Sequence, residues 1–578
     1  GFQGGGAALL AELLERVIQD LSQDRAVSLV SQGAPQGVVS PTHNAYHHSF
    51  ALWSLYKGAW RVAEFLGIDP AGEGAGVAPG TLTLEPDPPQ VDLVVIDDAA
   101  MGFRQNSQAW PACLRAGHPW ILLKMSEPVG QGPLWQHLLE DHADRLVVLT
   151  TVADLRRTEV QISNGLSWER TAQDVSWELV HNPQINALSR CACVVVSFGA
   201  AGAVVHTRLP AGGSPPAPSA NRSHLVFDPG LIEGVWETAQ QGGMIGYTTC
   251  LAGGIARQML LAPGAADLLP GVQAGLAALR DLHQGGYHNH GTPAQPRLRF
   301  PIDRIAACLA KPADQFAIVE IQDPVRFLTA TGDYQEMAPE GGFWTILGDR
   351  YRGDLFEVCK RIVLQDAKTV LTDVPQGIFG GLFTVDRQEI ESFRSISTLA
   401  AEYLSQERPK RPLSIAVFGA PGSGKSFGIT QVANSLAPDR IQVLEFNLSQ
   451  FEGPHQVAEA LHQVRDVNLS GKFPLVFWDE FDTPLDGKPL GWLRYFLAPM
   501  QDGAFREGQV MHPIGPAIFV FAGGTSHRMG SFGVGLEEKL YREAKVPDFI
   551  SRLKGFVNVL GPNPQGESDP FFMIRRAI

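Results

Sequence analysis

The chain has 578 residues, of which 44% are hydrophobic and 18% charged, and its net charge is −14. This length predicts several domains with ordinary hydrophobic cores, and the negative charge argues against a broad duplex-DNA-binding surface, which would need a basic footprint. The six cysteines are sparse and indicate reduced core residues. The sequence has no signal peptide and no apolar run of membrane-spanning length. We therefore expect a cytoplasmic protein with no membrane partner, and from its charge we expect no clear nucleic-acid partner.

The first half of the chain alternates between strand-like and helix-like segments. Residues 7–25 have the spacing of an amphipathic helix. Apolar runs of strand length follow at 91–97, 120–125, 145–151 and 193–199. Strands that alternate with helices predict a parallel sheet covered on both faces. Asp97 and Asp98 stand at the end of the first of these runs, either as a ligand or metal contact or as a solvated strand end.

A second alternating pattern occupies the C-terminal third. A polar stretch at 285–296 indicates a boundary, and a mixed segment after it ends in a predicted helix at 389–406. From Leu413 onward, strand and helix patterns alternate again. The predicted fold class is therefore α/β, with two three-layer α/β/α domains joined by a mixed linker region.

One motif in this third has a specific chemistry. The strand-like run 413–418 leads directly into GAPGSGKS at 419–426, a GxxxxGK[ST] loop in a strand–loop–helix context. Its glycines let backbone N–H groups surround an anion, and the N-terminus of the next helix adds positive potential. We expect Lys425 to reach the β- and γ-phosphates of ATP, and Ser426 to bind Mg²⁺. The expected nucleotide-binding residues are Gly419, Pro421, Gly422, Ser423, Gly424, Lys425, Ser426 and Phe427.

A pair of acids supplies the rest of an ATP-hydrolysing site. In PLVFWDEFD at 474–482, an apolar strand ends in Asp479 and Glu480. We expect Asp479 to hold the Mg²⁺ ion, and Glu480 to orient and deprotonate the attacking water. Paired acids can also mark an ordinary solvated strand end, but this pair lies downstream of a phosphate-binding loop.

Two further residues are candidates from their positions. Thr525 ends the strand-like run AIFVFAGGT, where it would touch the γ-phosphate or the attacking water. Arg552 stands immediately before the last strand-like run, where an arginine can donate to the phosphate of a neighbouring subunit. The alternative for Arg552 is an ordinary surface arginine.

In this order, GAPGSGKS, VFWDEFD, FAGGT and SRLKG resemble the Walker A, Walker B, sensor 1 and arginine-finger motifs of AAA+ ATPases. The resemblance covers about residues 410–578. It implies a homo-oligomeric ring, often a hexamer, with ATP bound between subunits. The family's helical lid should begin at 571–578, so we expect the lid to be truncated or missing in this chain.

Three patches in the first half resemble ribokinase-type (PfkB) sugar and nucleoside kinases. They are the helix entrance KGAWRVAEFLG at 57–67, the strand–turn–strand segment VVVSFGAAGAVV at 194–205, and GYTTCLAGG at 246–254. The family's third motif has an aspartate that takes a proton from the acceptor hydroxyl. Thr249 stands at that position, and its neutral hydroxyl cannot act as this base. The resemblance therefore implies a pseudokinase that still binds a small molecule or a protein partner.

Together, the patterns predict an N-terminal helix (1–25), a ribokinase-like domain (26–285), a mixed linker domain (286–388) and an AAA+ domain (389–578). The predicted function is an ATP-hydrolysing motor or switch whose front domain senses a ligand or recruits a partner. Two alternatives remain open. One is a nucleotide-gated scaffold in signalling or antiphage defence with little turnover, and the other is an active ribokinase-type kinase.

Overall fold

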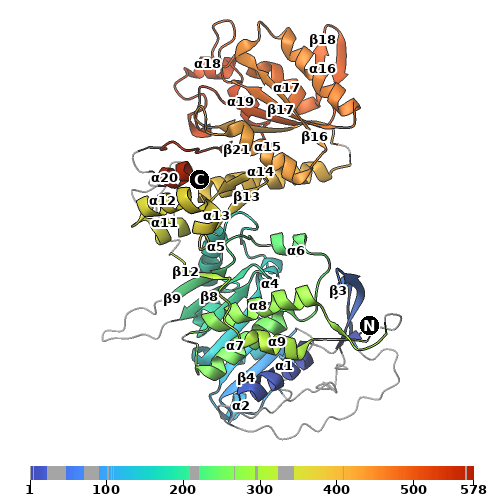
Figure 1. Ribbon diagram of the computed structural model, residues 1–578, viewed down its shortest axis with the longest axis vertical. Helices are drawn as coiled ribbons and strands as arrows, with labels where there is room; N and C mark the ends of the chain where they lie inside the picture. The colour runs from blue at the N-terminus through green and yellow to red at the C-terminus, as the bar shows by residue number, and fades with distance from the viewer. Residues whose placement is uncertain are drawn as a thin grey trace. The chain divides into compact units, whose positions relative to one another are not determined.

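The computed structural model divides the chain into two compact units, residues 1–329 (unit 1) and 330–578 (unit 2) (Figure 1). Both units are α/β, as the sequence predicts. No helix in the part of the chain that the structure describes is long and apolar enough to cross a membrane. The described residues are 2–3, 6–21, 47–70, 90–99, 103–105, 107, 110–208, 221–265, 267–292, 297–322, 344–407, 409–566, 569 and 571–578.

Unit 1 is built on a seven-stranded sheet with the order β12-β9-β8-β7-β6-β5-β4. Four neighbouring strands of this sheet are parallel to one another: β4 (Leu93–Asp98), β5 (Trp120–Met125), β6 (Leu146–Thr151) and β7 (Cys193–Ser197). The sheet continues antiparallel through β8 (Gly202–Arg208), β9 (Asn221–Phe227) and β12 (Ala317–Glu320). The predicted parallel strands are confirmed, and their apolar runs are buried because helices cover both faces.

The two faces of this sheet pack against different helices. On one face, α7 (Tyr247–Leu261) and α8 (Leu269–Gly285) share a core with alternate residues of the central strands. On the other, Trp168 of α5 (Trp168–His181) lies 5.6 Å from Phe198 and 6.0 Å from Phe227, measured between ring centroids. The other helices of unit 1 are α1 (Gly6–Leu21), α2 (Cys113–Ala116), α3 (Pro133–Asp141), α4 (Val152–Arg157), α6 (Val235–Ala239) and α9 (Ile302–Leu309).

Small sheets complete unit 1, and one of them corrects an expectation. Residues 57–67 were expected to enter a helix, but they form a turn and strand β3 (Ala59–Pro70), which pairs with β2 (His47–Tyr56). The reason is the tight turn: Lys57 and Gly58 both have positive φ, at 48° and 86°, which suits a two-residue hairpin. The remaining strands are β1 (Phe2–Gln3), β10 (His288–Asn289) and β11 (Leu298–Arg299).

The structure divides the segment 286–388 between the two units. Helix α9 packs on α1, α7 and α8, and β12 pairs with β9, so both belong to unit 1. The predicted N-terminal helix is likewise α1, packed into unit 1 against α7 and α9. In unit 2 lie α11 (Ile346–Tyr351), α12 (Leu355–Gln365), α13 (Ala367–Val370), β13 (Gly377–Phe379) and β14 (Leu382–Thr384).

Unit 2 is built on a five-stranded parallel sheet with the order β16-β17-β20-β15-β21. Successive residues of each strand face different cores: Ile415 and Val417 face one, and Ala416 and Phe418 the other. A sheet buried on both faces needs such apolar runs. The strands are β15 (Leu413–Phe418), β16 (Ile441–Asn447), β17 (Phe473–Asp479), β20 (Ile518–Ala522) and β21 (Gly555–Asn558).

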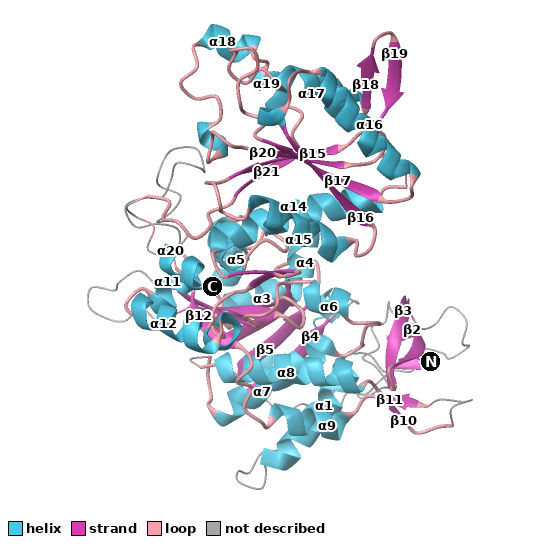
Figure 2. Ribbon diagram, turned by 45° about the horizontal axis from the view of Figure 1, so that its top comes forward, coloured by secondary structure: helices cyan, strands magenta, loops and turns pink. Residues whose placement is uncertain are grey.

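Helices form a layer on each face of this sheet (Figure 2). On one face lie α14 (Arg387–Ser405) and α15 (Lys425–Leu436). On the other lie α16 (His455–Leu469), α17 (Leu493–Asp502) and α19 (Val546–Ile550). The hairpin β18 (Ala504–Glu507) and β19 (Val510–Pro513) stands beside α16, and α18 (Glu538–Glu543) and α20 (Phe572–Ala577) complete the unit.

Helices α7 and α8 cross with their backbones in close approach. A Cβ atom at Gly254 would lie 2.4 Å from the carbonyl oxygen of Gly271 and 2.8 Å from the nitrogen of Gly275. Because these are backbone atoms, they cannot move aside without separating the helices. The three glycines therefore set the distance between the two helices that cover this face of the sheet.

We predict that Gly254→Ala lowers the free energy of local opening of α7 and α8 by about 2 kcal/mol, the cost of overpacking a close-packed site. Amide hydrogen exchange in the full chain measures this opening. The control is Gly243→Ala, where an added Cβ meets nothing within 4 Å, and it should change the opening energy by less than about 0.5 kcal/mol. Unchanged protection of α7 in the Gly254 variant would contradict the packing described here.

Candidate active site

The loop between β15 and α15 has the backbone of an anion-binding cradle. Gly422 and Gly424 have φ values of 76° and 86°, which suit glycine. Gly424 caps α15, so the free N–H groups of the helix's first turn face the loop. A Cβ at Gly419 would lie 2.5 Å from the Ser423 hydroxyl oxygen. The strand–loop–helix order expected from the sequence is thus the one the structure has.

Lys425 folds back onto this loop. Its ammonium donates hydrogen bonds to the carbonyl oxygens of Gly419, at 2.8 Å, and of Ala420, at 3.4 Å. Burial lowers the pKa of Lys425, and the nearby Asp479 carboxylate opposes this shift. An anion in the cradle would replace the carbonyls as acceptor and favour the charged ammonium.

Asp479 ends β17 at the same level of the sheet as the loop begins. Ala522 of β20 pairs with Val417 of β15 on one side and with Asp479 on the other. Burial raises the pKa of Asp479, and the neighbouring Glu445 carboxylate adds to the shift. A divalent cation would offset both causes. The Asp479 carboxylate and the Ser426 hydroxyl in the first turn of α15 are oxygen donors of the kind that Mg²⁺ prefers.

Glu480 has an unusual backbone conformation. Its φ is 55°, which costs free energy in a residue other than glycine. Thr483 holds this turn, since its amide and hydroxyl donate to the Glu480 carbonyl oxygen at 3.1 and 2.7 Å. A Cβ at Gly524 would lie 2.8 Å from the Glu480 Cγ atom. The Glu480 side chain therefore lies against the loop that follows β20.

Asp482 organises that loop, a role that the sequence interpretation missed. Its carboxylate is buried and accepts hydrogen bonds from the amides of Gly524 (2.8 Å), Thr525 (3.0 Å) and Ser526 (2.8 Å). It also accepts a hydrogen bond from the Thr525 hydroxyl, at 2.7 Å. The hydroxyl proton is thus committed to Asp482, and only the lone pairs of Thr525 are available to a water. The signal in the sequence was the third acid of DEFD.

A cavity of about 150 Å³ lies beside the loop. The β13–β14 hairpin lines it with Leu382 and Phe383, and the loop side contributes Ser423, Gly424 and Phe427. The Gly381 amide of the hairpin turn donates to Gln431 of α15, at 2.7 Å, which fixes the hairpin against that helix. The sequence interpretation assigned no function to this hairpin, although the apolar GIFGGLF run with a Gly-Gly turn is a hairpin signal.

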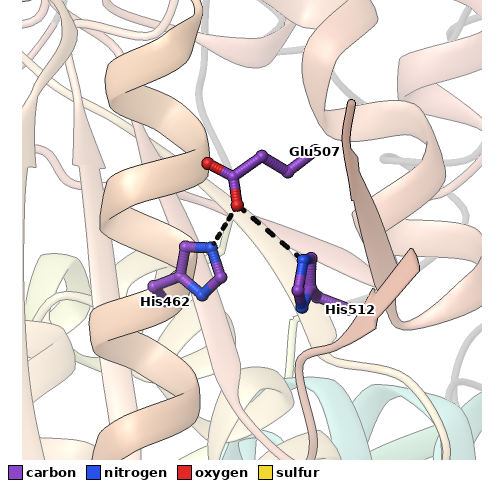
Figure 3. Close-up of side chains that lie close together, drawn as sticks. All are labelled: His462, Glu507 and His512. Carbon is purple, nitrogen blue, oxygen red and sulfur yellow. Dashed lines mark hydrogen bonds and ion pairs between the residues drawn. The ribbon is translucent and has the colours of Figure 1, made fainter. Parts of the chain in front are cut away.

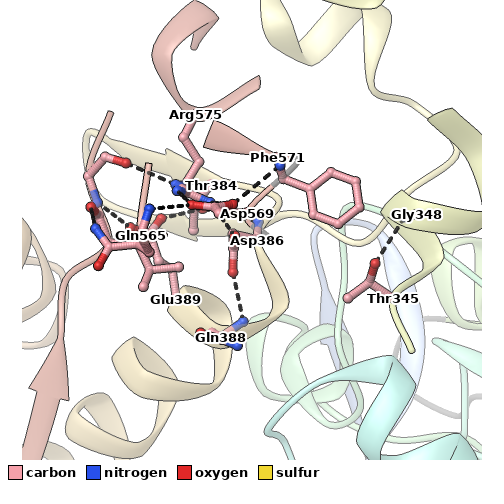
Figure 4. A network of polar contacts seen from close by, with 12 residues as sticks. Thr345, Gly348, Thr384, Asp386, Gln388, Glu389, Gln565, Asp569, Phe571 and Arg575 are labelled. Atoms are coloured by element: carbon pink, nitrogen blue, oxygen red, sulfur yellow. Dashed lines mark hydrogen bonds and ion pairs between the residues drawn. The ribbon is translucent and has the colours of Figure 1, made fainter. Parts of the chain in front are cut away.

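A buried ionic network around Arg575 joins α20 to the N-terminus of α14 and to the chain after β21 (Figure 4). Arg575 of α20 pairs with Asp386 at 2.9 Å and with Asp569, and its Nε atom donates to the Gly561 carbonyl oxygen at 2.9 Å. Burial raises the pKa values of Asp386 and Glu389, and Arg575 opposes this for both. The residues expected to begin a lid, 571–578, thus include α20, whose arginine ties the N-terminus of α14 to the chain after β21.

Arg552 lies at the opposite end of the strands, where their N-termini are. It precedes β21, whereas the phosphate-binding loop follows β15, and the two strands run parallel. At about 3.3 Å per residue, these ends are roughly 15–20 Å apart. The guanidinium of Arg552 donates to the Asp548 carbonyl oxygen and to the Gln501 side chain. It lines a cavity of about 390 Å³ together with Arg411 and Lys554. Arg552 is therefore not part of its own chain's cradle.

The candidate residues of unit 1 are occupied by internal contacts. Asp97 pairs with Lys124 at 2.8 Å, and Asp98 is buried in an ion pair with Arg104. Neither of the two interpretations given for these acids, a ligand contact or a solvated strand end, describes such ion pairs. Thr249 lies in the first turns of α7 with only 1% of its surface exposed.

No protein-family model matches the chain, and no curated protein does. Parts of the chain are similar to three solved structures. The Aeropyrum pernix ORC2 protein is 14% identical, over 29% of this chain and 47% of that chain, with a TM-score of 0.21. DnaI is 16% identical, over 35% of this chain and 92% of that chain, and the S. cerevisiae Hsp104-ADP complex is 14% identical, over 59% and 57%, each with a TM-score of 0.22. The chain spans about half the length of the ORC2 protein. Because these TM-scores are low, the likeness assigns no family, and the site is defined by its own geometry.

We predict that Asp482→Asn releases the loop after β20. The amide of asparagine would face three N–H donors that now share a carboxylate, and the loss of charged hydrogen bonds costs about 3 kcal/mol, or roughly 100-fold faster amide exchange at 524–526. Hydrogen exchange measures this directly. The exposed Asp486, changed to Asn in the same segment, is the matched control and should leave exchange at 524–526 unaltered. Equal protection in both variants would contradict the role of Asp482.

Proposed function

We propose that unit 2 binds ATP with Mg²⁺ and hydrolyses it, as an AAA+ type motor or switch. The observation that supports this most is the meeting of two motifs at one sheet edge. The glycine-rich cradle and its lysine lie at the level where β17 ends in Asp479 and Glu480. Lys425 is close enough to both acids for their charges to act on its pKa.

The residues of this edge have separate roles in the proposed reaction. Lys425 leaves the loop carbonyls and binds the β- and γ-phosphates, while the amides of the loop and of α15 surround them. Ser426 and Asp479 would hold a Mg²⁺ ion, whose charge would stabilise the negative charge that develops on the phosphates. Glu480 accepts the proton of the attacking water. Thr525, positioned by Asp482, accepts a hydrogen bond from that water.

We place the base of the nucleotide in the cavity beside the cradle. Phe383 and Phe427 offer aromatic surface there, and Leu382 and Val559 offer aliphatic surface. Phe427 is 52% exposed, an unusual state for a phenylalanine, and a bound base would cover it. We therefore assign adenine recognition to the β13–β14 hairpin and the first turn of α15.

A homo-oligomeric ring, with a hexamer as the expected size, would complete the site. Arg552 lies at the sheet edge opposite its own cradle, so it can reach a phosphate only in a neighbouring subunit. Contacts between one surface and a different surface of the next copy form a ring when the rotation between copies closes, and an open filament when it does not. The cluster of Arg552, Arg411 and Lys554 is positively charged, as a surface that meets a phosphate needs to be.

For unit 1 we propose ligand sensing or partner recruitment without phosphoryl transfer. The residue at the position of the ribokinase-type base, Thr249, is neutral and buried, and both properties disfavour the kinase alternative. Phe300 packs against the N-terminus of α7, because a Cβ at Gly246 would lie 2.7 Å from its ring.

We predict that Lys425→Ala weakens ATP binding at least tenfold and abolishes phosphate release, because the phosphates lose their cation. Glu480→Gln should keep ATP binding and lower phosphate release about 100-fold or more, the usual effect of losing a general base. Binding is measured with a fluorescent ATP analogue, and turnover by phosphate release. The matched controls are the exposed Lys472→Ala and Glu459→Gln, which should behave as the wild type.

Two results would overturn this assignment in favour of the alternatives. Tight ATP binding with no turnover at any protein concentration would support the nucleotide-gated scaffold. Transfer of labelled phosphate from ATP to a pooled set of sugars and nucleosides, unaffected by Lys425→Ala, would support the active kinase.

We predict that Arg552→Ala lowers turnover about 100-fold or more, the effect of losing an arginine donated in trans, without weakening ATP binding. Mixing it 1:1 with Lys425→Ala should restore activity to roughly a quarter of wild type, because random mixing pairs an intact cradle with an intact arginine at that fraction of head-to-tail interfaces. The exposed Arg542→Ala is the control. A mixture that stays inactive would contradict a shared site.

A further inference from the structure

Three potential metal ligands converge between α16 and the β18–β19 hairpin (Figure 3). His462 lies on α16, Glu507 ends β18, and His512 lies on β19. The Nε2 atoms of His462 and His512 lie 2.9 and 3.7 Å from the same Glu507 carboxylate oxygen. All three ligand atoms lie within 4.8 Å of one another. None of these residues belongs to the candidate nucleotide site.

Packing fixes the two imidazole rings in this arrangement. Phe505 of β18 stacks on the ring of His512, with centroids 5.3 Å apart, and meets the ring of His462 edge-on at 4.8 Å. The histidine side chains are only 24% and 26% exposed, while Glu507 is 56% exposed. Two ligands are thus held by an aromatic neighbour, and the third is free to adjust. Such pre-positioning reduces the ordering cost of binding an ion.

The spacing of the three ligand atoms is close to that around a tetrahedral ion. Zn²⁺ binds histidine nitrogen and carboxylate oxygen at about 2.0–2.2 Å, so neighbouring ligand atoms in a tetrahedron lie about 3.3 Å apart. The two contacts to Glu507 lie on either side of this value.

The charges of the cluster favour a cation. Glu507 offers a carboxylate oxygen, and each histidine offers the lone pair of a neutral imidazole nitrogen. Two imidazoles with one carboxylate are ligands of intermediate softness, which select Zn²⁺ and related transition metals over Mg²⁺. Arg465 also acts on Glu507, and its positive charge opposes the binding of a cation.

We propose that His462, Glu507 and His512 form a binding site for a divalent transition-metal ion, with Zn²⁺ as the expected occupant. The ion joins the hairpin to α16 through one ligand from each of α16, β18 and β19, and its fourth position is left to water. The hairpin meets α16 and α17, so the ion would fix its direction relative to the core of unit 2. This inference does not depend on nucleotide binding.

The test is metal titration of the full chain without nucleotide. Equilibrium dialysis should give one Zn²⁺ per chain, and Co²⁺ should give the intense visible absorption of a tetrahedral site. His462→Gln and His512→Gln should each weaken binding at least tenfold, since even indirect partners of a metal ligand cost 10–100-fold. Zn²⁺ should also slow amide exchange of the hairpin, residues 504–513, in the wild type but in neither variant.

Two matched control variants distinguish Zn²⁺ binding at this cluster from Zn²⁺ binding elsewhere on the chain. His455→Gln changes an exposed histidine on the same helix, and Asp486→Asn changes an exposed acid outside both proposed sites. Both should bind Zn²⁺ as the wild type does. If the two cluster variants bind Zn²⁺ with unchanged stoichiometry and affinity, or if Zn²⁺ leaves hairpin exchange unchanged, the proposal is overturned. Because the cluster lies at the surface, the variants should remain folded, which their metal-free unfolding curves would verify.

Discussion

The parallel register of β15, β20 and β17 is the constraint on which the candidate active site depends. Ala522 pairs with Val417 on one side and Asp479 on the other, so three chain segments leave the sheet at one level. The glycine-rich loop, the acid pair and the loop of Thr525 must therefore meet. A shift of one residue in this register would turn each strand's side chains to the wrong core. The apolar faces that bury the sheet thus also fix the site.

Electrostatics at this edge leaves charges that a ligand would satisfy. Burial works against the charged forms of Lys425 and Asp479, and Glu445 adds a like charge beside Asp479. Asp482, in contrast, is fully occupied by the loop after β20. The group that positions the site is hydrogen-bonded, whereas burial destabilises the charged forms of the groups that would meet phosphate or cation.

Unit 2 places two kinds of site in different parts of one layered structure. The nucleotide cradle draws on α14, α15 and the chain after β21, where the Arg575 network joins them. The histidine–glutamate cluster draws on α16 and the β18–β19 hairpin on the other face of the sheet. A metal ion there would stabilise the hairpin without touching the cradle. Fixing the hairpin and filling the cradle are thus separable events in the same unit.

The sequence by itself determined the local features of this protein. The loop at 419–426, the acids Asp479 and Glu480, and the apolar runs of the parallel strands follow from residue type and spacing over short distances. Only the tertiary structure decided which distant groups meet. Asp482 binds amides more than 40 residues away, the β13–β14 hairpin lines the cradle's cavity, and residues 286–388 divide between two cores. Spacing along the chain does not predict such partners, because strand order and packing determine which distant residues come into contact.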